Sequence, residues 1–208
     1  MINTIVIDTE DMDVNPSAVI LSIGGFALDV TSTSETQSAI LQVARDPELA
    51  IYSAQAFYGL VDTFEQLMMG RSVSSETQQW WRAQGEEAHE ALIGERQSLA
   101  TQLLHLSGWI SQHREARIFF RGTDFDGSIL EHAYRMCGME CPWSYNGKRD
   151  VRTYIDAMTR GIRGYVKDHQ PSFAMVKHSA LHDAMNDAMN DAEQMTLAYQ
   201  INSQMLAA

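Results

Sequence analysis

A mixed β-sheet flanked by α-helices, an α/β fold, is the architecture that this 208-residue sequence predicts. Three observations predict it. Val- and Ile-rich segments come first, helical spacing of apolar residues follows from about residue 61, and a short apolar strand then returns before the last helices. Such interleaving is typical of α/β proteins. No linker or low-complexity stretch divides the chain, so we expect a single domain over residues 1–208.

The first two expected strands are residues 4–8 (TIVID) and 18–30 (AVILSIGGFALDV). Both are rich in Val and Ile, and the turn-like sequence DMDVNPS lies between them, which predicts a hairpin or a pair of adjacent strands. A further short strand is expected within 53–60. After three helices, the continuous apolar run in ARIFFRG, residues 116–122, predicts another strand.

The helices are predicted from apolar residues spaced three to four positions apart. Ser74 is expected to cap one of them, because SSET resembles a capping box. Gly138 is expected to close another. The segment 149–161 is expected to pass from loop or strand into helix. The other expected helices lie within residues 60–70, 74–93, 98–110, 126–138 and 178–206.

The formal net charge of −12 argues against a protein that grips duplex nucleic acid through a broad basic face. It does not exclude a nucleic-acid enzyme whose acidic site is neutralised by divalent metal. The N-terminal sequence lacks a secretory pattern, and no stretch approaches the roughly 18 apolar residues of a membrane-spanning helix. With only two cysteines, Cys137 and Cys141, we expect an intracellular, cytoplasmic protein with reduced thiols.

Asp8 and Glu10 stand at positions i and i+2 of the leading strand. Their side chains therefore point to one face, about 6.5 Å apart, and Thr9 points to the other. Like charges this close destabilise a strand unless something positive lies between them, which a pair of divalent cations would supply. The alternative is that the strand has ended and the acids are solvated loop residues.

A second pair of acids, Asp124 and Asp126, lies between the apolar strand at 116–122 and a helix. The carboxyl ends of strands are favoured places for sites in α/β sheets. The alternative role for Asp126 is to cap its helix. The two roles are compatible, because a capping carboxylate at this corner can also face a metal.

Two histidines precede an aspartate by five positions near the start of the terminal helix: His178 with Asp183, and His182 with Asp187. Five residues correspond to about 140° of separation on a regular helix, so the histidine must lie at the helix entry to approach its aspartate. This favours His178 over His182, which is already inside the helical pattern. The alternative is a capping or surface histidine.

Together, in this order, the three motifs resemble the 3′→5′ exonucleases of the DEDDh type, which have an RNase H-like fold. The segments that carry the resemblance are IDTE, FDGSIL and HSALHDA. The sequence is most similar to the phage and bacterial branch that includes the T4-type exonuclease A and the mycobacterial exoribonuclease. The segments PSAVILSIG, ETQQWW and RDVRT are shared with that branch, so the resemblance spans nearly the whole chain.

The resemblance implies a metal-dependent 3′→5′ exonuclease that releases nucleoside 5′-monophosphates from single-stranded DNA or RNA by a two-metal mechanism. Its cofactors would be two Mg²⁺ or Mn²⁺ ions, which suit hard oxygen ligands. Its partner would be a nucleic-acid 3′ end, with no membrane involved and a homodimer left open. Carried over by position, the metal ligands would be Asp8, Glu10, Asp126 and Asp183, and the general base would be His178.

The sequence also departs from this family. Asp11 and Asp13 stand where relatives usually have Thr and Gly beside the 3′ end, so we expect these acids to disfavour an approaching phosphate. Two other functions therefore stay open: a module of the same fold that binds nucleic acid or protein without cutting, and a phosphodiesterase for short oligonucleotides.

Single-strand binding usually needs stacking aromatics and a few cations. Of the adjacent Trp80 and Trp81, only one can easily face the core. Arg121 lies beside the second motif. The segment WSYNGKRDVRTY offers the remaining candidates, Trp143, Tyr145, Lys148, Arg149 and Arg152.

Overall fold

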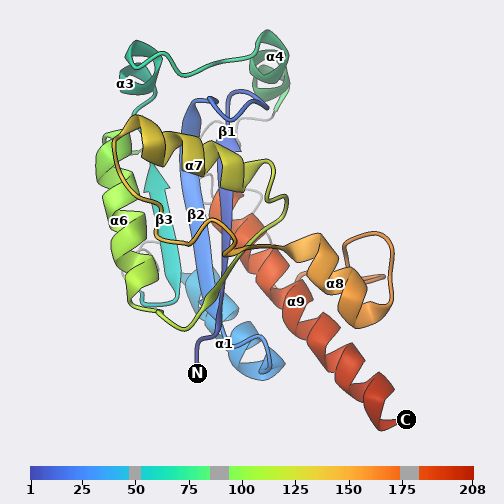
Figure 1. The fold of residues 1–208 in the computed structure, drawn as a ribbon. Helices are drawn as coiled ribbons and strands as arrows, with labels where there is room; N and C mark the ends of the chain where they lie inside the picture. Colours follow the sequence, from blue (N-terminus) through green and yellow to red (C-terminus); the bar gives the residue numbers. More distant parts are fainter. Residues whose placement is uncertain (47–52, 85–93, 174–182) are drawn as a thin grey trace.

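Five strands form a mixed sheet in the order β3-β2-β1-β4-β5 in the computed structural model, which describes residues 1–46, 53–84, 94–173 and 183–208 (Figure 1). β1 pairs antiparallel with β2 and parallel with β4; β3 is antiparallel to β2, and β5 is parallel to β4. The predicted mixed sheet is confirmed. The strands are β1 (Thr4–Asp11), β2 (Ile20–Leu28), β3 (Ala56–Leu60), β4 (Arg117–Phe120) and β5 (Lys148–Asp150).

The hairpin of β1 and β2 is the centre of the sheet. Asp8 lies opposite Gly24 and Glu10 lies opposite Ser22, and the register shifts only between Glu10 and Asp11. The strand therefore continues through both acids. The alternative in which they are solvated loop residues after the end of the strand is wrong.

Helices cover both faces of the sheet, as the alternation of side chains along a strand requires. Ile5 and Ile7 of β1 belong to a buried cluster with α6 and α7, whereas Val6 belongs to a second cluster with α1, α8 and α9 (Figure 1). The described helices are α1 (Thr33–Arg45), α3 (Thr63–Met68), α4 (Ser75–Ala83), α6 (Leu99–Ser111), α7 (Asp126–Met136), α8 (Val151–Thr159) and α9 (Asp183–Ala207).

The predicted ends of two helices are confirmed. The Ser74 hydroxyl accepts a hydrogen bond of 3.0 Å from the Thr77 backbone N–H at the start of α4. Gly138, with φ of +65°, follows the end of α7. The segment 149–161 enters its helix from a strand, β5, and Asp150 caps α8.

Two differences from the sequence prediction concern helix length and number. α4 ends at Ala83, where Gln84 turns to extended backbone; residues 85–93 of the longer expected helix lie outside the described part of the chain. Helix α1 was not predicted. The signal was present, since Thr36, Ile40 and Val43 are buried at helical spacing. Among the described helices, none is long and apolar enough to cross a lipid bilayer.

Gly24 allows α9 to lie directly on the sheet. A Cβ atom at this position would lie 2.2 Å from the carbonyl carbon of Ala184 and 2.3 Å from the backbone nitrogen of Met185. The backbone of α9 therefore occupies the space that a side chain would need. Because Gly24 is opposite Asp8 in the hairpin, the start of α9 is held close to the acids of β1.

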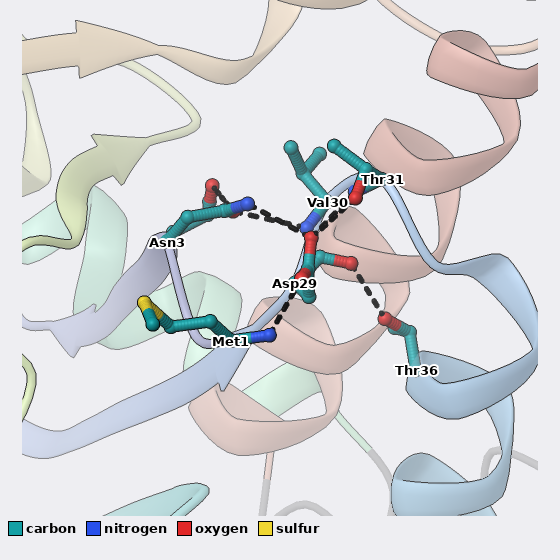
Figure 2. Close-up of polar contacts among 7 residues, drawn as sticks. Met1, Asn3, Asp29, Val30, Thr31 and Thr36 are labelled. Atoms are coloured by element: carbon teal, nitrogen blue, oxygen red, sulfur yellow. Dashed lines mark hydrogen bonds and ion pairs between the residues drawn. The ribbon is translucent and has the colours of Figure 1, made fainter.

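The other end of the hairpin is tied by the Asp29 carboxylate (Figure 2). It accepts hydrogen bonds of 2.8 Å from the Met1 ammonium and 2.8 Å from the Asn3 amide, and Thr31 donates to it through its backbone N–H and its hydroxyl. These donors lower the pKa of Asp29 from its ordinary value. The backbone carbonyl of Asp29 accepts a hydrogen bond from the Thr36 hydroxyl, which joins α1 to the same corner.

Replacing Gly24 with alanine is expected to destabilise the fold. The added methyl group would meet backbone rather than a movable side chain, and overpacking of this kind costs about 1–3 kcal/mol, occasionally more. Gly108→Ala is the matched control, because Gly108 lies inside α6 and a Cβ atom added there would have no other atom within 4 Å. Alanine at that position should stabilise the helix by about 0.5–1 kcal/mol. Urea unfolding measures both. Equal stability of the two variants would contradict the close approach of α9.

Candidate active site

Three carboxylates from two elements meet on the α9 side of the sheet. Asp8 and Glu10 come from β1, and Asp187 comes from the first turns of α9. One oxygen from each lies within 4.8 Å of the others. Asp8 and Glu10 are partly buried, and Asp187 is exposed. Asp8 and Glu10 therefore lie on one face of β1, as predicted, and Asp187 is the acid from a distant part of the chain that joins them.

The surroundings of Asp8 change its pKa. Burial, followed by the charges of Asp126, Asp187, Glu10 and Asp191, raises the pKa of Asp8 well above its ordinary value. Each of these effects disfavours the ionised form. A divalent cation between the carboxylates would reverse them, and an all-oxygen donor set suits Mg²⁺ or Mn²⁺. The residues present therefore fit the metal ions that the sequence predicts.

Asp126 approaches the cluster from the other side of β1. It is the first residue of α7 and is 4% exposed. The Thr9 hydroxyl donates to its carboxylate over 3.1 Å. Burial raises the pKa of Asp126 to about 6. The charge of Asp126 contributes to the raised pKa of Asp8, but Asp126 is not a member of the group of three.

The sequence had left a capping role open for Asp126 and had raised Asp124 as a second candidate. The capping position of α7 is occupied by Phe125, so Asp126 does not cap its helix. Asp124 is exposed, whereas Asp126 is buried beside Thr9. Of the two acids, Asp126 is therefore the one that lies next to the cluster.

The third motif falls partly outside the described residues. His178 and His182 lie in the segment 174–182, which the structure does not describe, and the same holds for the side chain of Asp183, the first residue of α9. The assignments of His178 and Asp183 stay predictions. Among the side chains of α9 that the structure describes, Asp187 is the one whose carboxylate lies with those of Asp8 and Glu10. The second His-x4-Asp spacing was the signal for it.

An ion pair fixes α9 one turn beyond Asp187. Asp191, a buried residue, lies 2.6 Å from Nε and 2.5 Å from Nη2 of Arg121, which follows β4. The same guanidinium donates to the backbone carbonyl of Gly164 over 3.1 Å. Asp191 was missed in the sequence, and Arg121 was expected to contact substrate; the structure instead uses the pair to join α9, β4 and the loop after α8.

Asp11 and Asp13, the two acids that the sequence places beside the 3′ end, are both buried. Asp11 is 7% exposed and accepts a hydrogen bond of 2.7 Å from the Thr9 hydroxyl, while Asp13 is 6% exposed and accepts from the Val14 N–H and the Asn15 amide. Against the effect of burial, hydrogen bonds from Ser72 and these neighbours lower the pKa of Asp13. The two carboxylates thus accept hydrogen bonds within the end of β1 and the turn that follows it, and they do not project into solvent.

The adjacent tryptophans divide as predicted. Trp81 is 7% exposed and donates its indole N–H to the Asp11 carbonyl over 3.0 Å, whereas Trp80 is 56% exposed. The rings meet edge to face, with centroids 5.1 Å apart. Trp81 therefore supports the backbone immediately after Glu10.

The segment WSYNGKRDVRTY contributes less to binding than its composition suggests. Trp143 is buried, with its ring centroid 5.4 Å from that of Phe120 and 5.8 Å from that of Tyr134. Lys148 forms an ion pair of 2.9 Å with Glu131. Trp143 is therefore a core residue, and the candidates in the segment that are exposed are Tyr145, Arg149 and Arg152.

Comparison with solved structures identifies the fold. The nuclease domain of 3′hExo, a DEDDh family member, bound to rAMP, is similar to this chain with a TM-score of 0.53. The match covers 98% of this chain and 91% of that chain, at 13% sequence identity. This likeness establishes the fold, which is RNase H-like, as the sequence predicted. The comparison with curated proteins gives no match.

A family model carries the identification further. The model described as the 3′-5′ exoribonuclease Rv2179c-like domain matches residues 3–194, which is nearly the whole chain. The predicted class, a 3′→5′ exonuclease, is confirmed by the family model, and the fold is similar to that of a DEDDh family member. The carboxylates gathered on β1 and α9 thus lie in a chain that belongs to the Rv2179c-like 3′-5′ exoribonuclease domain family.

Proposed function

We propose that this 3′→5′ exonuclease acts on single-stranded RNA or DNA with two divalent metal ions and releases nucleoside 5′-monophosphates. The observation that carries the proposal is the group of Asp8, Glu10 and Asp187, whose oxygens lie within 4.8 Å of one another in a member of an exoribonuclease family. Mg²⁺ and Mn²⁺ are the ions that such hard oxygen ligands favour.

Each residue then has a distinct duty. Asp8, Glu10, Asp126 and Asp183 hold the ions, and Asp187 lies beside Asp8 and Glu10. The Thr9 hydroxyl, 3.1 Å away, orients the Asp126 carboxylate. When bound, two such ions supply an activated water and stabilise charge on the leaving oxygen. A histidine, with an ordinary pKa near 6.5, accepts the proton of that water at neutral pH.

For the residues of the third motif, we propose the register His178 with Asp183, which the sequence favours. Asp183 is the first residue of α9, so a histidine five positions earlier stands before the helix in the sequence. The backbone of Ala184, the next residue, lies against Gly24, which is opposite Asp8. Asp183 and Asp187 are four positions apart and lie on the same side of a helix. Because a carboxylate oxygen of Asp187 lies near those of Asp8 and Glu10, the register His182 with Asp187 is the competing one.

The function is tested with 5′-labelled single-stranded RNA and DNA in the presence of Mn²⁺. The wild-type protein should shorten the label stepwise from the 3′ end and release 5′-monophosphates, and Asp8→Asn should abolish this, because the variant removes a ligand with little change in shape. Mn²⁺ should also stabilise the wild-type fold, by about 2.7 kcal/mol at 100 times its dissociation constant, but not the variant.

The other outcomes separate the alternatives. Cleavage of dinucleotides but not of longer strands would identify a phosphodiesterase for short oligonucleotides. If wild type and Asp8→Asn both leave the strand intact but still retard it in a native gel, the protein is a binding module and the proposal fails.

The register of the third motif is tested by two matched pairs of variants. We expect Asp183→Asn to abolish turnover and Asp187→Asn to be milder, and we expect His178→Ala to lower kcat by about 10²-fold or more, the usual contribution of a general base. His182→Ala is its control. Single-turnover rates on one labelled strand measure all four. Greater damage from His182→Ala and Asp187→Asn would establish the competing register.

Asp126 predicts a dependence of stability on pH in the metal-free protein. Its pKa in the folded protein is about 6, above its ordinary value of 3.8, so the folded state retains this proton at pH values where the unfolded state has lost it. The contribution to stability is fully present below about pH 4 and is lost as the pH rises through 6. Urea unfolding in EDTA should therefore show wild type losing on the order of 1–3 kcal/mol relative to Asp126→Asn between pH 4 and 7. A constant difference would contradict the raised pKa.

A further inference from the structure

Positive charge is concentrated in one segment of this acidic protein. Residues 148–167 carry six of the 15 Lys and Arg residues but only two of the 27 Asp and Glu residues. The segment comprises β5, α8 and the loop that follows α8. A polyanion approaching a chain of net charge −12 is attracted most strongly to such a region.

The loop after α8 lies beside the acid cluster. Arg121 contacts the Gly164 carbonyl with Nη1 and the Asp191 carboxylate with Nε. Asp191 is one helical turn, about 6 Å, from Asp187. One guanidinium thus connects the loop to the part of α9 that carries the third carboxylate. A strand with its 3′ end at the cluster can reach this loop with the nucleotides next to that end.

The loop is held in a defined conformation. The Asp156 carboxylate accepts hydrogen bonds of 3.0 Å from the Arg163 N–H and 2.9 Å from the Gly164 N–H, and the Gln194 side chain accepts one of 3.2 Å from the Val166 N–H. Gly164 has a φ of +73° and packs against Arg152: a Cβ there would lie 2.5 Å from the Arg152 Cβ. A preorganised surface loses little conformational entropy on binding.

The side chains on this loop and on α8 match what single-strand binding requires. Arg152, Arg163 and Tyr165 are exposed, and Arg163 Nη1 lies 3.4 Å from the Tyr165 hydroxyl. An aromatic face stacks on any base, and neighbouring guanidinium groups contact phosphates. By contrast, Trp143, one of the two aromatic residues predicted for this role in WSYNGKRDVRTY, is buried.

We propose that Arg152, Arg163 and Tyr165 form a platform that binds the single-stranded polynucleotide upstream of the 3′ end, with phosphates on the two arginines and a base on the tyrosine. The inference rests on the proposed function of the acid cluster. It assigns the segment that holds the rest of the strand while the terminal nucleotide lies at Asp8, Glu10 and Asp187.

The platform is tested by the affinity of the full protein for a 5′-labelled single-stranded RNA, measured by fluorescence anisotropy with Ca²⁺ in place of Mg²⁺ over a series of KCl concentrations. Arg163→Gln should weaken binding and lower the salt slope by about 0.7, the value for one phosphate contact on a single strand. Tyr165→Ala should lose about 5- to 150-fold in affinity, the range for one base stack, and Tyr165→Phe should retain it.

Arg114→Gln is the matched control. Arg114 is an exposed arginine in the turn before β4, at the opposite end of that strand from Arg121. Its variant should bind with wild-type affinity and slope. If Arg163→Gln and Arg114→Gln give the same slope as wild type, or if Tyr165→Ala keeps full affinity, the platform is wrong.

Dinucleotide hydrolysis by the wild-type protein separates this failure from that of the proposed function. Hydrolysis that depends on Asp8, together with unchanged binding by Arg163→Gln and Tyr165→Ala, overturns the platform and leaves the function intact. A wild-type protein that cleaves neither dinucleotides nor longer strands overturns the function itself, and the platform with it.

Discussion

The packing of α9 onto the β1–β2 hairpin is the constraint on which the rest of this structure depends. Met185, Met189 and Met195 are buried against the sheet, and full burial of each such side chain contributes roughly 1.5–3 kcal/mol. This apolar contact outweighs the repulsion between Asp187 and the acids of β1. Burial, and after it the charges of Asp126 and Asp187, raise the pKa of Asp8. Apolar packing of α9 on the sheet therefore brings the carboxylates together, although their charges repel one another.

Most of the sheet could be predicted from the sequence, because its strands are short apolar runs bounded by turn residues. The acids of β1 could be predicted for the same reason, since a strand fixes which face each side chain takes. Helix α1 was missed because it is polar overall and buries only a narrow row of residues, with Thr36 among them. The burial of Asp11 was not predicted, because it depends on a hydrogen bond from Thr9 on a face of β1 that the apolar pattern no longer marks.

The third motif shows where sequence reasoning reaches its limit. Residues four apart share one side of a helix, so a repeated AMND sequence presents equivalent aspartates in turn. The position of α9 along the sheet decides which of these aspartates lies next to Asp8. That position is set by two contacts remote from the motif in sequence, the glycine at position 24 and the ion pair of Arg121 with Asp191. Neither contact leaves a local pattern, so only the three-dimensional structure relates Asp187 to Asp8.

The hydrogen bond from the Trp81 indole to the Asp11 carbonyl has a practical consequence. It places a natural fluorophore one residue beyond Glu10, attached to the backbone of the strand that carries the metal-binding acids. Its emission responds to changes in its polar surroundings, so cation loading can be followed optically in the unmodified protein. Replacing the exposed Trp80 with phenylalanine would remove the neighbouring signal, and the buried Trp109 and Trp143 would remain as a constant background.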